Sequence, residues 1–151
     1  MKMKKPLIAT VMGLSLLCFG TGASAAETDG VVDSDVIQSN KQAKPGMIST
    51  MAVPSNTSNT NTYTPFGGGT YAVSSSSSTT LEDYIYAKCR TFNGTDGSLI
   101  NSNSASANRS SYISAKANNG TIYFANDWAI GNHTYKLSGY NDVVHETKAY
   151  W

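Results

Sequence analysis

The chain has 151 residues, a formal net charge of +1 and only 14% charged residues. A chain so close to neutrality lacks the concentrated basic face that nucleic-acid binding needs, and it does not resemble a cationic membrane-lytic peptide. With so few charges, serine, threonine and asparagine must solvate the surface, as in many extracellular β-proteins.

The first residues have the pattern of a secretory signal peptide. Three lysines precede the apolar run 7–19, and Ala23-Ser24-Ala25 forms a small-residue cleavage site. The apolar run is too short to span a bilayer. We therefore predict that residues 1–25 are a leader, that the protein is secreted, and that no membrane span remains after the leader is removed.

Residues 26–69 are predicted to be a disordered linker or a propeptide. They contain few large apolar residues with any periodicity, and they include the polar run from Pro54 to Thr62. Such a segment buries too little apolar surface to offset the entropy lost on ordering.

The folded part is predicted at residues 70–151, around a strand at 81–93. One face of this strand presents Ile85, Ala87, Cys89 and Thr91, and the other presents Tyr84, Tyr86, Lys88 and Arg90. Asn-Gly and Asp-Gly follow at once, and a new apolar run begins at Leu99, so the pattern predicts a β-hairpin.

Short alternating segments separated by turn residues make up the rest of this part. A first edge strand is expected at 70–73 and a flexible connection at the serine run 74–78. Further strands are expected at 98–107, 110–117, 121–125, 133–138 and 143–151. The chain is therefore predicted to be all-β, a small antiparallel β-sandwich of about six or seven short strands, with Trp151 closing one end.

The cysteines exclude an internal disulfide once the leader is gone. Cys18 lies in the apolar run of the leader, which leaves Cys89 alone. We interpret Cys89 as a small buried apolar residue; the alternative is a reactive thiol or a covalent dimer contact.

No catalytic or metal motif is present. His133 and His145 each fall on a predicted strand without the spacing of a metal site. They are interpreted as half-exposed strand residues, although they would meet across the sheet if their strands paired. No nucleophile-elbow motif and no marked carboxylate pair occur. We therefore predict no cofactor and no enzyme activity, with a small extracellular hydrolase as an alternative.

The aromatic residues carry the functional hypothesis. Tyr84 and Tyr86 share a face with Lys88 and Arg90 on a surface that is otherwise rich in serine, threonine and asparagine. Tyrosine rings stack on apolar faces while their hydroxyls form hydrogen bonds, as sugar- and protein-binding sheets require. These four residues are the predicted binding site, and the expected partner is a cell-wall or envelope component or an extracellular protein.

Three short pieces of the folded part resemble the lactococcin 972 type of Gram-positive bacteriocin. They are Gly69-Thr70-Tyr71, Ala115-Lys116-Ala117 and the closing Ala149-Tyr150-Trp151. The resemblance implies a β-sandwich and an antibacterial protein that acts on cell-wall synthesis. Our main hypothesis is a secreted, non-enzymatic β-sandwich of a Gram-positive bacterium that binds the cell envelope or an extracellular partner, and a bacteriocin-like protein is the alternative.

Overall fold

A computed structural model describes residues 40–46, 53–120 and 126–151. These residues form five antiparallel strands: β1 (Asn56–Tyr63), β2 (Thr70–Phe92), β3 (Leu99–Gly120), β4 (Trp128–Lys136) and β5 (Val143–Tyr150). The described residues contain no helix, and hence none that could cross a membrane. The all-β, antiparallel prediction is confirmed. The predicted leader 1–25 and the predicted strand 121–125 lie outside the described residues.

Two long strands replace several of the predicted short ones. β2 has 23 residues and β3 has 22. The serine run 74–78, expected to be a flexible connection, lies inside β2 and pairs with both β1 and β3. Serines 74 and 76 are buried, so this stretch alternates between inside and outside with hydroxyls in place of apolar side chains. The strand count is therefore five in the described residues rather than six or seven.

The β2–β3 hairpin bends in its middle. The register shifts between the pairs Ser77↔Tyr112 and Glu82↔Ser110, so residues 78–81 of β2 face Ser111 of β3 alone. Arg109 has a φ of 49°, a left-handed conformation that non-glycine residues seldom adopt. Extra residues on one strand sharpen its bend and its twist.

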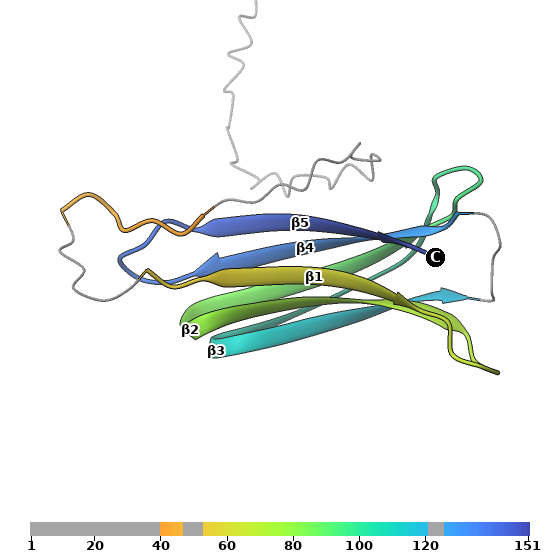
Figure 1. Cartoon of the computed structure of the whole chain (residues 1–151), viewed down its shortest axis with the longest axis horizontal. Helices are drawn as coiled ribbons and strands as arrows, with labels where there is room; N and C mark the ends of the chain where they lie inside the picture. The colour runs from red at the N-terminus through yellow and green to blue at the C-terminus, as the bar shows by residue number, and fades with distance from the viewer. Residues whose placement is uncertain (1–39, 47–52, 121–125) are drawn as a thin grey trace, which may run out of the picture.

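The bend curls one continuous sheet into a half-barrel (Figure 1). We call β1 with residues 70–78 of β2 and 112–120 of β3 the first half-sheet. The second half-sheet contains residues 82–92 of β2 and 99–110 of β3, followed by β4 and β5. β1 also packs against β4 and β5, so the two half-sheets share one interior.

The prediction that residues 26–69 are a linker is wrong for β1. β1 pairs along its whole length with β2, and Thr60 is buried. Its inward residues, Asn56, Ser58 and Thr60, are polar, so the alternation contains no apolar signal. Side-chain hydrogen bonds inside the half-barrel stabilise this strand instead of apolar burial.

Residues 40–46 lie beside the turn between β4 and β5, and we call this segment the strap. Ala43 forms an isolated antiparallel bridge with Tyr140. The amide of Lys44 donates to the carbonyl of Gly139 over 2.9 Å, and that of Asn141 donates to the carbonyl of Gln42 over 2.9 Å. The strap therefore docks on the folded part, although it precedes the predicted domain boundary.

The apolar interior has two clusters, and one of them is made of small residues. One cluster contains Ala72, Ala87, Cys89, Ala115, Ala117 and Ala129, and Trp151 packs against it. A second cluster contains Ile85, Tyr135 and Val143. Cys89 is fully buried, as predicted, and desolvation raises the pKa of its thiol. The indole N–H of Trp151 donates to the carbonyl of Tyr63 over 3.3 Å, which closes this end of the half-barrel as expected.

Candidate functional site

The predicted site lies on the outer face of the second half-sheet. Tyr84, Tyr86 and Lys88 are half-buried there, on the face opposite Ile85 and Ala87. The prediction of which side chains share the outer face is therefore correct for these three residues.

Arg90 does not fit the predicted role. Its side chain is 5% exposed, donates to Oδ1 of Asn132 over 2.8 Å and lies 5.7 Å from the centroid of Phe92. Asn132 in turn donates to Glu146 on β5 over 2.8 Å. Arg90 therefore ties β2 to β4 and β5, and it presents little surface to a partner.

Small hydroxyl side chains flank the two tyrosines. Tyr84 pairs with Asn108, and Tyr86 pairs with Ser106; Ser104 and Ser102 continue the row along β3. All four β3 side chains are exposed. On the other side, Tyr86 pairs with Thr134 of β4, and the ammonium of Lys136 lies 6.0 Å from the ring centroid of Tyr84. We call Tyr84, Tyr86 and this β3 row the tyrosine face.

A second aromatic group lies at the far end of the same outer face. The ring of Trp128 stacks on that of Phe92 with centroids 5.7 Å apart. The ammonium of Lys148 lies 5.2 Å from Trp128 and 4.9 Å from Tyr150. The sequence alone does not show that these residues lie together, because they come from three strands and the pairing of those strands is known only from the fold.

The two histidines lie side by side on the inner face of the sheet. His133 and His145 are direct partners in the β4–β5 register, and they are 0% and 5% exposed. The prediction that they would meet if their strands paired is confirmed, and the interpretation as half-exposed residues is wrong. Desolvation, and then the nearby His145, lower the pKa of His133 to about 4.

The donor and the acceptor of each hydrogen bond around His133 can be assigned in turn. Ser76 donates its single proton to the carbonyl of Tyr86 over 2.8 Å, so it accepts from Nδ1 of His133 over 2.9 Å. Nε2 of His133 is then an acceptor, and Thr147 donates to it over 2.8 Å. Thr147 accepts from Thr60 over 2.6 Å, and Thr60 accepts from Ser74 over 2.9 Å. We call this series the hydroxyl chain.

Ser58 and His145 are in contact like a serine nucleophile and its histidine base, but here the histidine donates the hydrogen bond and the serine accepts it. Tyr135 donates to the carbonyl of Thr57 over 2.7 Å, so Ser58 must donate to Tyr135 over 2.7 Å. Ser58 therefore accepts from Nδ1–H of His145 over 2.7 Å. A serine in this arrangement cannot pass its proton to the imidazole, so the pair does not activate a nucleophile.

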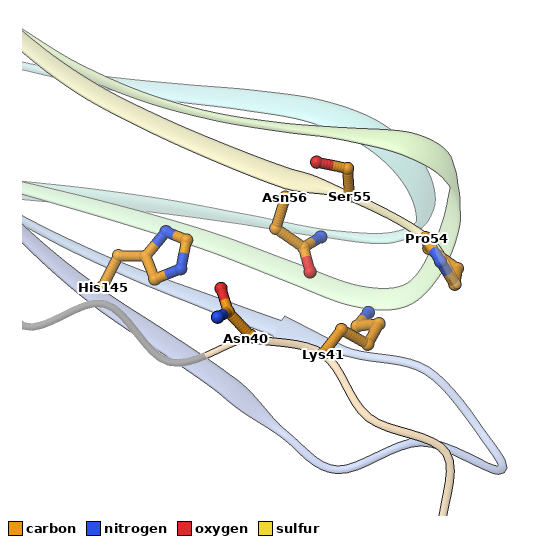
Figure 2. A pocket seen from close by; sticks show the side chains of 6 residues that line it. All are labelled: Asn40, Lys41, Pro54, Ser55, Asn56 and His145. Carbon is orange, nitrogen blue, oxygen red and sulfur yellow. The ribbon is translucent and has the colours of Figure 1, made fainter. Parts of the chain in front are cut away.

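A small hollow of about 160 Å³ opens beside His145 (Figure 2). It is lined by Asn40, Lys41, Pro54, Ser55, Asn56 and His145. These lining residues, all within the described part of the chain, include no carboxylate. In the same described part, no three histidine, cysteine or acidic side chains gather in a way that would hold a metal ion.

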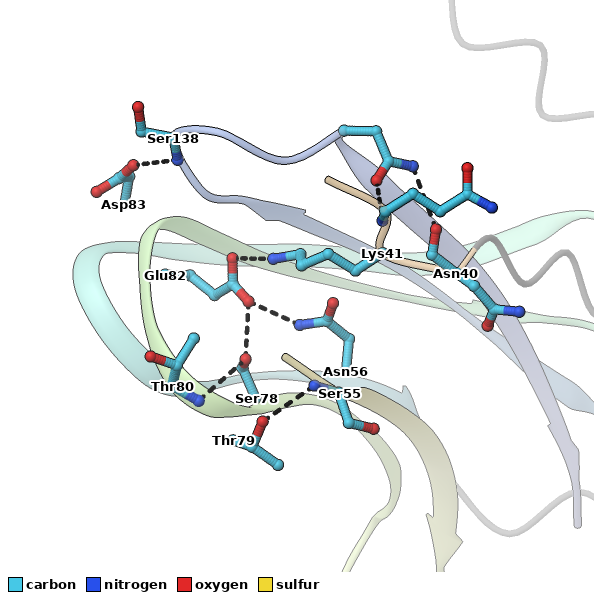
Figure 3. A network of polar contacts seen from close by, with 12 residues as sticks. Asn40, Lys41, Ser55, Asn56, Ser78, Thr79, Thr80, Glu82, Asp83 and Ser138 are labelled. Carbon is cyan, nitrogen blue, oxygen red and sulfur yellow. Dashed lines mark hydrogen bonds and ion pairs between the residues drawn. The ribbon is translucent and has the colours of Figure 1, made fainter. Parts of the chain in front are cut away.

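Behind the hollow lies a buried ion pair (Figure 3). Lys41 of the strap binds Oε2 of Glu82, and the side chains are 1% and 0% exposed. Oε1 of Glu82 accepts from Nδ2 of Asn56 over 2.8 Å and from Ser78 over 2.7 Å. This cluster could not be predicted from the sequence, because it joins residues of the predicted linker to the central hairpin.

Comparison of the chain with protein-family models, with curated proteins and with solved structures finds no match in any of the three.

Proposed function

We propose that this protein is a secreted, non-enzymatic β-sandwich-like module that binds a polysaccharide of the bacterial cell envelope through the tyrosine face. One observation carries the proposal: two half-exposed tyrosines lie beside an exposed row of serine and asparagine side chains on the outer face of the β2–β3 strand pair. The leader pattern at 1–25 supports export to the compartment where such a polymer is found.

The chemistry of the face suits a neutral sugar polymer. Tyrosine rings offer apolar surface to the C–H faces of sugars, and hydroxyl and amide groups match their hydroxyls. Alternate residues of a strand are roughly 7 Å apart, so Ser102, Ser104 and Ser106 form a regular row along β3. An extended chain that lies along this row would contact both tyrosines.

Three basic residues lie near the face: Lys88, Arg90 and Lys136. Lys88 is half-buried in the same row as the tyrosines. Lys136 forms an exposed ion pair with Asp142 over 3.3 Å, and Arg90 is occupied by Asn132. An exposed ion pair contributes little binding energy. A neutral sugar has no charge for Lys88 to pair with. The tyrosine rings and the hydroxyl row therefore have to supply most of the affinity, so binding should depend weakly on salt.

Co-sedimentation of the full chain with purified Gram-positive cell walls tests the proposal. We expect the wild type to sediment and the double variant Tyr84→Ser with Tyr86→Ser to remain in solution. Tyr112→Ser is the matched control, because Tyr112 is a 57% exposed tyrosine on the first half-sheet. Equal sedimentation of the double variant and the wild type would contradict the proposal.

Growth of related bacteria should be scored in the same experiment. Binding with growth inhibition would favour the bacteriocin-like alternative, and binding without inhibition would favour an envelope-binding module. Unfolding of the double variant, seen by circular dichroism, would mean that the tyrosines serve the fold instead.

A further inference from the structure

We propose that Lys41 and Asn56 form an intramolecular amide cross-link, with Glu82 as the proton-transfer group. The three residues meet at the bend of the half-barrel, and each comes from a different segment: the strap, β1 and β2. This inference is independent of the tyrosine face and of any partner.

The geometry places the two reacting groups on one carboxylate. Lys41 binds Oε2 of Glu82, and Nδ2 of Asn56 donates to Oε1 over 2.8 Å. The amine and the amide are therefore held on the two oxygens of a single side chain (Figure 3). Holding two reactants in a fixed relation accelerates their reaction strongly.

The lysine has to pass a proton to Glu82 before it can react. The side chains of Lys41 and Glu82 are 1% and 0% exposed, and charges are costly to keep away from water. Transfer of one proton from the ammonium to the carboxylate removes both charges and leaves a neutral amine. A neutral amine is a nucleophile, whereas an ammonium is not.

The reaction balances without any added reagent. The neutral amine of Lys41 attacks Cγ of Asn56, and a new C–N bond forms. Glu82 returns its proton to Nδ2, and the original Cγ–Nδ2 bond breaks. The Lys41 nitrogen still carries a second proton, which Glu82 takes up and passes to the departing ammonia, so the leaving group departs as ammonium. The product is a secondary amide between the two side chains, and Glu82 is again a carboxylate after two protons have passed through it.

Two further features fit this chemistry. Oδ1 of Asn56 is buried and has no hydrogen-bond partner among the described residues. This oxygen is therefore available to accept a hydrogen bond when negative charge develops on it. The hollow of about 160 Å³ borders both Lys41 and Asn56 (Figure 2), so ammonia has a way out.

Mass spectrometry of the purified full chain tests the proposal. The cross-linked protein is lighter than its sequence by one ammonia molecule. Trypsin does not cut after an acylated lysine, and the next lysine, Lys44, precedes Pro45, a bond that trypsin also leaves intact. We therefore expect one tryptic fragment that runs through Lys41 to Lys88 and whose fragment ions place the link at Lys41 and Asn56.

Variants separate the roles. Lys41→Arg keeps the charge but cannot form the amide, and Glu82→Gln keeps both reacting groups but cannot transfer the proton; both should have the unshifted mass. Lys44→Ala, on the same strap, should still cross-link. If Glu82→Gln fails to fold, the mass of Lys41→Arg still tests whether Lys41 forms the amide.

Three outcomes would overturn the proposal. A protein of full sequence mass has no link. A loss of water instead of ammonia would mean that Lys41 is joined to Glu82 itself. A loss of ammonia in a protein that trypsin still cuts after Lys41 would indicate a succinimide at an asparagine instead of a cross-link.

Discussion

Acidification should destabilise this protein through His133. The pKa of His133 is lowered from its ordinary value of 6.5 to about 4 in the folded state, because the imidazole is buried. The folded state therefore disfavours the charged form that the unfolded chain accepts. The stability contributed by neutral His133 is complete above pH 6.5, falls as the pH drops toward 4, and does not change further below that value.

The size of the effect follows from the shift in pKa. The difference between 6.5 and about 4, at about 1.4 kcal/mol for each pH unit, amounts to about 3 kcal/mol of unfolding free energy. The hydroxyl chain explains why the folded protein does not adjust easily to a protonated His133. A proton on Nε2 would face the hydroxyl proton of Thr147, so Thr147, Thr60 and Ser74 would all have to turn.

Urea unfolding at a series of pH values measures this effect. With a typical dependence of 1–3 kcal/mol per molar urea, the midpoint should fall by about 1–3 M between pH 6.5 and 4. Carboxylates also titrate near the acid end, so the wild type is compared with His133→Gln, whose amide cannot ionise. Parallel stability curves for the two proteins across this range would refute the reasoning.

Three other changes test separate parts of the fold. Gly131→Ala should cost about 3 kcal/mol in urea unfolding, because a Cβ there would lie 2.1 Å from Thr60 Oγ1 and break the hydroxyl chain; unchanged stability would show that the two half-sheets separate easily. Removal of the last three residues should lower the unfolding free energy by about 2–3 kcal/mol, since Trp151 packs on the alanine cluster and bonds Tyr63; an unaltered thermal transition would contradict this. Cys89 should react with a thiol reagent only after denaturant is added, because burial raises its pKa; rapid labelling of the native protein would count against the buried assignment.

The central hairpin could be predicted from the sequence because its two signals agree. Alternation through Ile85, Ala87 and Cys89 marks one apolar face, and the glycine-containing turns at 93–97 mark the reversal of the chain. The burial pattern of β2 follows that alternation. The positions of Tyr84 and Tyr86 on the outer face were predictable for the same reason.

β1 and the serine run were not predictable, because apolar periodicity is the signal on which strand prediction depends. In these segments the inward positions hold Ser58, Thr60, Ser74 and Ser76, whose hydroxyls bond one another and the histidines. When the inward and the outward residues of a strand are both polar, its hydropathy pattern is the same as that of a linker. The buried Lys41–Glu82 pair was hidden in the same way, since nothing in the local sequence around Lys41 indicates burial.

The bend in the β2–β3 hairpin also constrains how the chain folds. Both half-sheets are built on the same two strands, and the only tight reversal between those strands is the turn at 93–98. Pairing that starts at this turn must align residues 82–92 with 99–110 before it reaches the bend and can align residues 70–78 with 112–120. Short loops close at lower entropic cost than long ones, so residues 82–92 and 99–110, which carry the tyrosine face, should pair before residues 70–78 and 112–120.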